Sequence, residues 1–322
     1  MATSLISPPP AFCGVSTALI TPFRDGQMDL PALEKLVDWQ IVEGIHGLVV
    51  AGSTGESLSL TEAERDELLQ TALQAAGGRV PVVAGTGSSD TATAIRLTQS
   101  AEKLGASAAM VVAPAYNKPT QEGLFQHFRA IHDASSLPII LYDVPGRTVV
   151  QLAVETVARL AELPRVIGIK DANDNLARPL RLRLATRPDF LLLGGEDQTV
   201  LAFLAQGGQG WISVTSNVAP RLCIQLYNAW GAMLAGQGDW AEVNRLNLAL
   251  LPLSDALFLE TNPAPTKHAL SRMGLCQDEL RLPMVSVSPP TAAALQQVLA
   301  KLHLPSHPAA QSGMPLTVTK RS

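Results

Sequence analysis

The chain has 322 residues, of which 47% are hydrophobic and only 16% charged, and its formal net charge is −4. This composition provides a large buried core, and the lack of a basic run excludes nucleic acid as an expected partner. No apolar run reaches the roughly 18 residues of a membrane helix, and the first ten residues lack the pattern of a secretory signal. Three scattered cysteines predict reduced thiols in a cytoplasmic protein, and the six histidines show no metal-ligand spacing.

Strand and helix patterns alternate along the first 234 residues. Short apolar runs between turn signals predict strands at 14–20, 45–50, 80–84, 108–113, 138–142, 166–170, 190–193 and 211–214. Helical patterns follow them at 30–43, 61–77, 90–104, 121–134, 152–163, 173–186, 197–206 and 220–234. Thr61 and Glu64 have the spacing of a capping box, and Asp90 is expected to cap the next helix.

Eight strand–helix units indicate an α/β protein with a parallel sheet, and their number suits a closed (β/α)8 TIM barrel. A doubly wound open sheet is the alternative, but Thr21-Pro22-Phe23 after the first strand is not its glycine-rich phosphate turn. We therefore predict a leader at 1–11, a barrel at 12–234 and a C-terminal helical extension at 235–303. Its helices are expected at 239–259, 263–273 and 291–302, and a disordered tail at 304–322.

Lys170 ends an apolar, β-branched run that reads as a buried strand. An unpaired ammonium is costly to bury, so the simpler interpretation is a lysine that reaches solvent or pairs with a carboxylate. The two-residue period places Val166, Gly168 and Lys170 on one face, with Gly168 leaving room beneath the amine. The same period places Tyr142, on the preceding strand, where it can approach that amine.

Active sites of such barrels lie at the carboxyl ends of the strands, where this chain gathers hydroxyls, an arginine and Lys170. A dry barrel mouth favours a neutral amine, which can attack a keto group and form a Schiff base. A phenol such as Tyr142 can move the protons that this step needs, and Arg147 can hold a carboxylate through two hydrogen bonds. The residues therefore favour a 2-keto acid as substrate.

Several motifs, in this order, resemble the dihydrodipicolinate synthase family of pyruvate-dependent Schiff-base lyases and aldolases. The resemblance covers about residues 12–302. The motifs are Gly52-Ser53-Thr54-Gly55-Glu56-Ser57, Ala84-Gly85-Thr86-Gly87, Tyr116-Asn117-Lys118-Pro119-Thr120-Gln121, Tyr142-Asp143-Val144-Pro145-Gly146-Arg147-Thr148, Ile167-Gly168-Ile169-Lys170, Gly210-Trp211-Ile212-Ser213-Val214-Thr215-Ser216-Asn217, Asn262-Pro263-Ala264-Pro265-Thr266-Lys267 and Leu280-Arg281-Leu282-Pro283-Met284. One such motif is weak evidence, whereas the ordered set is specific for this superfamily.

The resemblance implies a role for each matching catalytic residue. Lys170 would form the imine with pyruvate. Tyr142 would be the general acid and base and, with Ser53 and Tyr116, would form a proton relay. Tyr116 would come from the neighbouring subunit across a tight dimer interface. Thr54 would hold the pyruvate carboxylate through its hydroxyl and its backbone N–H.

The resemblance also implies the remaining pocket and the reaction. Arg147 would bind the carboxylate of the second substrate, L-aspartate 4-semialdehyde, and backbone groups of Gly195 and Ile212 would line the pocket. The product would be 4-hydroxy-tetrahydrodipicolinate, an intermediate toward diaminopimelate and lysine, formed without a metal or separate cofactor. The family is usually a homotetramer, a dimer of tight dimers. Two rivals remain: a related pyruvate-dependent aldolase for a sugar aldehyde, and a binding protein without turnover.

Three features depart from the family pattern. Ser53 replaces the usual threonine, as in some sialic-acid lyases, although those lack a match to Arg147. Asp143 replaces the more usual asparagine after the catalytic tyrosine. The positions of the family's lysine-feedback pocket hold Arg65, Ser89, Thr93 and Ala115, where lysine-sensitive members have histidine, asparagine, glutamate and tyrosine. We therefore predict weak or absent inhibition by lysine.

Three other charged residues of the motifs are assigned no chemistry. We expect Glu56 to cap or brace its loop. Lys118 and Lys267 are expected to be solvated or structural.

Overall fold

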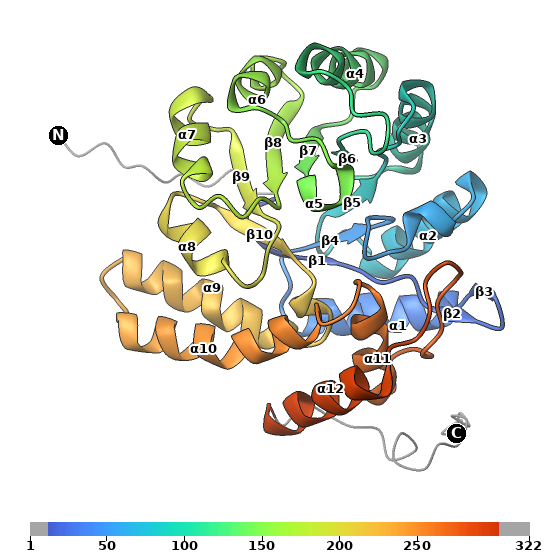
Figure 1. Ribbon diagram of the computed structural model, residues 1–322, viewed down its shortest axis with the longest axis vertical. Coiled ribbons are helices and arrows are strands. Elements are labelled where there is room, and N and C mark those ends of the chain that lie inside the picture. Colours follow the sequence, from blue (N-terminus) through green and yellow to red (C-terminus); the bar gives the residue numbers. More distant parts are fainter. Residues whose placement is uncertain (1–11, 303–322) are drawn as a thin grey trace.

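Eight parallel strands close into a barrel in the computed structural model, which describes residues 12–302 (Figure 1). The strands are β1 (Gly14–Ala18), β4 (Gly47–Val50), β5 (Val82–Gly85), β6 (Ala108–Val112), β7 (Ile139–Asp143), β8 (Val166–Asp171), β9 (Leu191–Gly194) and β10 (Gly210–Ser213). Strand β1 pairs with both β4 and β10, which closes the ring. The prediction of a (β/α)8 barrel is therefore confirmed.

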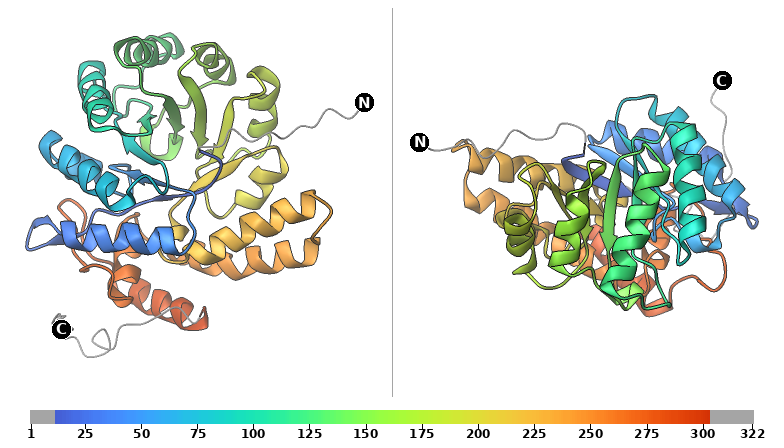
Figure 2. Two further views of the ribbon diagram at one scale, coloured as in Figure 1. Left: turned by 180° about the vertical axis from the view of Figure 1, so that it is seen from behind. Right: turned by 90° about the horizontal axis from the view of Figure 1, so that it is seen from above.

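Helices enclose the barrel on its outside, as the views from behind and from above show (Figure 2). They are α1 (Leu30–Val42), α2 (Glu62–Ala76), α3 (Thr91–Leu104), α4 (Gln121–Ala134), α6 (Val154–Ala161), α7 (Arg178–Ala185), α8 (Val200–Ala205) and α9 (Pro220–Leu234). After the barrel follow α10 (Trp240–Ala256), α11 (Ala264–Arg272) and α12 (Pro289–Lys301). Helix α10 lies beside α9, and α11 and α12 pack near the α1 side of the ring (Figure 1).

The capping signals in the sequence place two helices as predicted. Thr61 accepts from the backbone N–H of Glu64, whose side chain accepts from the N–H of Thr61, so the capping box is complete. Asp90 accepts from two N–H groups at the start of α3. Gly77 and Gly105 end α2 and α3 in the left-handed conformation, with φ of 58° and 91°. Each cap satisfies backbone groups that the helix itself leaves without partners.

Helix α7 begins at Arg178, five residues later than predicted. The Asn173 side chain accepts from the N–H of Asn175, and the Asn175 side chain accepts from the N–H of Ala177. Asparagine side chains that bind nearby backbone N–H groups compete with helix formation. The sequence analysis also missed the hairpin of β2 (Phe23–Arg24) and β3 (Gln27–Met28) and the short helix α5 (Pro145–Thr148), which are below the length that periodicity detects.

A β-bulge in β8 changes which side chains face the barrel interior. Ile139 pairs with Val166, but the next residue of β7, Ile140, pairs with Gly168, so Ile167 is the extra residue. Val166 consequently packs in the cluster between barrel and helices, which corrects the prediction that it shares a face with Lys170. Gly168 has a second function, because a Cβ there would lie 2.4 Å from the Cβ of Leu191 on β9.

Within residues 12–302, no helix is long and apolar enough to cross a membrane. In the same span, no group of three or more His, Cys, Asp or Glu side chains is placed to hold a metal ion. The predicted leader at 1–11 and tail at 304–322 lie outside the described residues.

Candidate active site

Lys170 and Tyr142 lie side by side at the carboxyl ends of neighbouring strands. They are register partners in the pairing of β8 with β7, and Lys170 Nζ lies 4.3 Å from the centre of the Tyr142 ring. The lysine is only 4% exposed and Tyr142 is buried. Tyr142 packs with the apolar side chains that fill the barrel interior, including Ile140 and Leu193. The amine therefore faces inward, and the interpretation of a lysine that reaches solvent is excluded.

Asn262 joins Thr54 to Arg147 on the other side of the mouth. Its side-chain Nδ2 donates to Thr54 Oγ1 at 2.9 Å, and its backbone oxygen accepts from Arg147 Nη2 at 3.0 Å. A hydroxyl has a single proton, and because the Thr54 oxygen accepts from Asn262, that proton stays available for a ligand. Thr54 and Asn262 are buried, whereas Arg147, on the short helix α5, is exposed. The two predicted carboxylate-binding residues thus share one anchor.

A buried ion pair braces the loop that carries Thr54. Lys267 of α11 pairs with Glu56, and neither side chain is exposed by more than 2%. The Glu56 carboxylate also accepts from the N–H of Arg281, and the Lys267 amine lies 4.0 Å from the centre of the Phe23 ring. Glu56 therefore braces its loop as predicted, and Lys267 is structural rather than solvated. The C-terminal helical region is in this way tied to the barrel mouth.

Gly195, directly after β9, and Ile212 of β10 are the two residues whose backbone groups were predicted to line the pocket. The N–H of Gly195 donates to the carbonyl of Asp171, and a Cβ on Gly195 would come within 2.6 Å of the Ala172 Cβ, so glycine is required there. Ile212 is buried among the interior side chains.

Glu196, the residue after Gly195, was not predicted as part of the site. Burial raises the pKa of its carboxyl group, an effect that the charges of Lys170 and Arg147 oppose.

Two predicted relay residues, Ser53 and Tyr116, form no hydrogen bond with Tyr142 within the part of the chain that the structure describes. Ser53 is half-buried in the turn after β4. Tyr116 is 92% exposed, with φ of 70°, on the loop after β6, where the Asn117 side chain donates to the carbonyl of Ser89. In residues 12–302, no hydrogen bond connects the hydroxyl of Ser53 or Tyr116 with Tyr142. Within one chain, the predicted relay is therefore incomplete.

Two aspartates and an arginine form a buried cluster on the outer side of β7 and β8. Asp143 and Asp171 directly follow Tyr142 and Lys170, and they are register partners. Arg178 donates to Asp143 Oδ2 at 2.8 Å and to Asp171 Oδ2 at 3.1 Å. Burial raises the pKa of Asp143 to about 7 and that of Asp171 to about 6, against the opposing charge of Arg178. The sequence pattern marks Asp143 as a departure from the family but indicates no partner for either aspartate.

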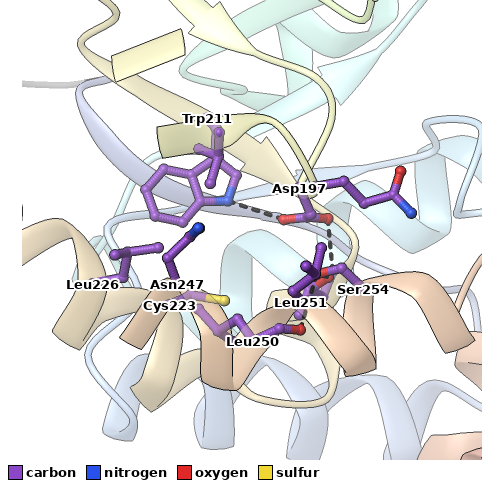
Figure 3. A pocket seen from close by; sticks show the side chains of 11 residues that line it. Asp197, Trp211, Cys223, Leu226, Asn247, Leu250, Leu251 and Ser254 are labelled. Carbon is purple, nitrogen blue, oxygen red and sulfur yellow. Dashed lines mark hydrogen bonds between the residues drawn. The ribbon is translucent and has the colours of Figure 1, made fainter. Parts of the chain in front are cut away.

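Another buried carboxylate, that of Asp197, supports the end of β10. It accepts from Trp211 Nε1 and Ser213 Oγ and from the N–H groups of Val214 and Thr215. The small cavity beside it is lined by side chains of α9 and α10 such as Cys223, Leu250 and Ser254 (Figure 3). Both Asp197 oxygens accept hydrogen bonds from these donors, so we assign Asp197 a structural role at the end of β10 and no catalytic role.

The arrangement can perform amine chemistry on a carbonyl compound that carries a carboxylate. It offers one buried amine, one phenol beside it, a hydroxyl free to donate and an exposed guanidinium. The contacts of Asn262, Glu196 and Arg178 were not predicted. Asn262 begins one of the motifs quoted above, but the motif alone does not indicate which residues it contacts. Glu196 and Arg178 carry no local signal, because their positions depend on contacts between separate βα units.

Comparison with known proteins identifies relatives over nearly the whole chain. The model of the Dihydrodipicolinate synthetase family matches residues 11–302. A Rhodospirillum centenum protein named 4-hydroxy-tetrahydrodipicolinate synthase is 53% identical over 291 residues, 90% of this chain and 97% of the relative. A Cereibacter sphaeroides protein of the same name is 50% identical over 89% of this chain and 97% of the relative. The crystal structure of dihydrodipicolinate synthase from Aquifex aeolicus has a TM-score of 0.88 and 38% identity, covering 92% and 99% of the two chains.

Proposed function

The chain belongs to the dihydrodipicolinate synthetase family, and from this premise we propose that it condenses pyruvate with L-aspartate 4-semialdehyde. The product is 4-hydroxy-tetrahydrodipicolinate, in the diaminopimelate route to lysine. The observation that carries the proposal is the buried Lys170 amine, 4.3 Å from the centre of the Tyr142 ring at the mouth of a closed barrel. No separate cofactor is needed, because the imine on Lys170 serves as the electron sink.

The reaction proceeds through covalent intermediates on Lys170. Its neutral amine attacks C2 of pyruvate, and loss of water gives an imine, while Tyr142 gives and takes the protons. Thr54 holds the pyruvate carboxylate with its available hydroxyl proton. Removal of a C3 proton gives an enamine that attacks the aldehyde, whose carboxylate Arg147 holds. The amino group of the second substrate then displaces Lys170 from C2, which closes the ring and frees the enzyme.

An assay with competing aldehydes tests this function against its rivals. Purified enzyme is incubated with pyruvate and either L-aspartate 4-semialdehyde or one of several sugar aldehydes, and the products are identified by mass spectrometry. We expect the cyclic product with the semialdehyde and a kcat/KM at least about a hundred-fold lower with each sugar aldehyde, which lacks the carboxylate for Arg147. Preference for a sugar aldehyde would assign the chain to a related aldolase, and no product with any aldehyde would favour a binding protein.

The proposal extends to the assembly, a homotetramer built as a dimer of tight dimers in the cytoplasm. The 92% exposure of Tyr116 supports it, since an exposed phenol on the loop after β6 is free to contact another subunit. Leu180 and Leu184 of α7 and Leu176, two residues before this helix, are also exposed and suit contact with another copy. The three cysteines are free, as in a reducing compartment.

A mixed-oligomer experiment tests whether Tyr116 acts across the interface. Chains with Tyr116→Phe and chains with Lys170→Ala are each nearly inactive alone, but a mixed dimer contains one site with an intact Lys170 and the partner's Tyr116. We expect co-expression of the two to restore roughly a quarter of the wild-type rate if the chains pair at random. Steady-state assays of the purified mixture measure it.

The control mixture combines Tyr142→Phe with Lys170→Ala. Both changes affect residues of the same chain's barrel, so no mixed dimer regains a complete site and no activity should return. If the Tyr116 mixture is also no more active than its separate components, Tyr116 does not act in trans.

Lysine should inhibit this enzyme weakly. Arg65 places a cation where lysine-sensitive members have histidine, and its guanidinium donates to the carbonyl of Ser57. Ser89, Thr93 and Ala115 lack the groups that would bind the ligand's charges.

We expect millimolar lysine to lower the rate by less than about two-fold, because charge-assisted hydrogen bonds supply most of such binding. Initial rates across a lysine titration measure it, and a variant with histidine, asparagine, glutamate and tyrosine at the four positions should gain sensitivity. Strong inhibition of the wild type would refute the prediction.

A further inference from the structure

The buried cluster of Asp143, Asp171 and Arg178 has no part in the reaction described so far. Arg178 is the first residue of α7, and its guanidinium reaches both carboxylates through different nitrogens, Nη2 to Asp143 and Nε to Asp171. All three side chains are at most 3% exposed. The second oxygen of Asp143 accepts from the N–H of Leu152 at 3.1 Å, which connects the cluster to the segment before α6.

Alternation along the strands places this cluster directly behind the catalytic pair. Asp143 and Asp171 face the helix layer because they follow the inward-facing Tyr142 and Lys170 by one residue. The backbone of the same residues holds the loops of the mouth. The carbonyl of Asp143 accepts from the N–H of Ala172 at 2.9 Å, and that of Asp171 accepts from the N–H of Gly195 at 2.8 Å. Each aspartate is therefore joined through one peptide bond to a catalytic residue, and its own backbone is held in the sheet at the mouth.

General stability does not account for such a cluster. Two buried carboxylates share one guanidinium, and burial raises the pKa of both acids, so burying the ionised cluster has a cost in free energy. Replacing buried ionic groups with well-packed apolar side chains is often neutral or stabilising. A planar guanidinium with fixed donor directions, however, sets the separation of two acceptors in a way that apolar packing cannot. The feature that it fixes is the relation between the ends of β7 and β8.

We propose that Arg178 is a positioning residue that, by bridging Asp143 and Asp171 behind the barrel wall, fixes the Tyr142 phenol against the Lys170 amine. The inference rests on the proposed function, since it concerns the imine-forming step of that reaction. It predicts that loss of the bridge slows imine formation, while Thr54 and Arg147, which are anchored by Asn262, keep their hold on the two carboxylates.

The test compares substitutions of the bridge with a control on the same helix. Arg178→Met removes both hydrogen bonds, Arg178→Lys keeps the charge without the planar fork, and Asp171→Asn keeps an acceptor for Nε. The control is Arg183→Met. Arg183 donates to the carbonyls of Pro188, Phe190 and Gly207 and to the Gln209 side chain, at the amino ends of β9 and β10. For each variant, borohydride trapping of pyruvate on Lys170 gives the rate of imine formation, together with kcat, both KM values and the melting temperature.

We expect Arg178→Met to slow imine formation and kcat about 10- to 100-fold with little change in either KM, the scale of a small misplacement of reacting groups. Arg178→Lys should fold, and its rate of imine formation should lie between those of Arg178→Met and the wild type. Asp171→Asn should form the imine within roughly three-fold of the wild-type rate, because the hydrogen bond from Arg178 Nε survives. Arg183→Met should lower the melting temperature but leave the trapping rate unchanged at 25 °C.

Two results would overturn the proposal. If the Arg178 variants trap pyruvate at the wild-type rate and lose only thermal stability, the cluster is structural. If Arg178→Met does not fold, the rate at which Arg178→Lys traps pyruvate is the test, and a wild-type rate again shows that the cluster is structural. A wild type that traps no pyruvate would overturn the proposed function itself, and this inference with it, so the two failures are distinguishable.

Discussion

Replacement of Lys170 by alanine is expected to abolish turnover. Within residues 12–302, Lys170 carries the buried amine that lies beside a phenol at the barrel mouth, and a dissolved amine cannot replace one that is held there. We expect kcat/KM to fall by roughly four orders of magnitude or more, the scale by which an intramolecular reactant exceeds a dissolved one. Lys170→Arg should be equally inactive, because the guanidinium stays protonated and is no nucleophile. Turnover is measured with pyruvate and L-aspartate 4-semialdehyde.

Borohydride reduction in the presence of pyruvate identifies the attacking lysine directly. The wild type should gain one reduced pyruvyl group per chain, and peptide mapping should place it on Lys170. The control is Lys118→Ala, which removes an exposed lysine of the neighbouring loop and should leave the adduct and the rate unaltered. Lys267 is buried but paired with Glu56, so it should stay unmodified. An adduct on any lysine other than Lys170 would contradict the mechanism.

Removal of the Tyr142 hydroxyl should have the second largest effect. Tyr142→Phe keeps the ring that packs against the Lys170 amine, so the variant should fold and retain the pocket. It lacks the proton donor and acceptor, and general acid–base catalysis contributes about 10²- to 10⁴-fold, which sets the expected fall in kcat. Trapping of pyruvate should slow in parallel, because imine formation itself needs proton transfer. Stopped-flow and steady-state rates measure both.

Tyr227→Phe is the matched control for that substitution. Tyr227 is one of the chain's three tyrosines, and its hydroxyl donates to the carbonyl of Gln209, just before β10 at the amino end of the barrel. Loss of that hydrogen bond should cost about 1 kcal/mol of stability and leave kcat within two-fold. Equal losses of kcat in the two variants would show that Tyr142 has only a packing role.

Much of the fold could be predicted because local chemistry and tertiary structure agree in this chain. The capping box at Thr61, the cap at Asp90 and the helix end at Gly77 each act within a few residues, and all are present. The bulge at Ile167 could not be read from the sequence, since β-branched residues on either side look continuous and only the pairing with β7 reveals the extra residue. The late start of α7 followed from asparagine side chains, whose competition with the helix the apolar pattern does not show.

The site divides in the same way. Lys170 and Tyr142 could be placed together because neighbouring parallel strands bring their ends to one rim, and the period of two selects the inward residues. Asn262 could not be placed there, since its contact with Thr54 joins residues 208 positions apart. The same holds for Arg178, which reaches back 35 positions to Asp143. Tyr116 follows the motif in the sequence, but its side chain is 92% exposed in the isolated chain, so its place in a site depends on contacts that one chain does not show.

The anchoring of Thr54 and Arg147 by Asn262 has a consequence for how the enzyme is made. When the ribosome has released the chain only as far as β10, all eight strands are present, yet Asn262, which anchors Thr54 and Arg147, is still untranslated. Lys267 and Arg281, which hold the Glu56 loop, emerge later still. A nascent or prematurely terminated polypeptide can therefore contain every strand of its barrel while the residues that brace the mouth are missing, so catalytic competence waits for the segment after β10.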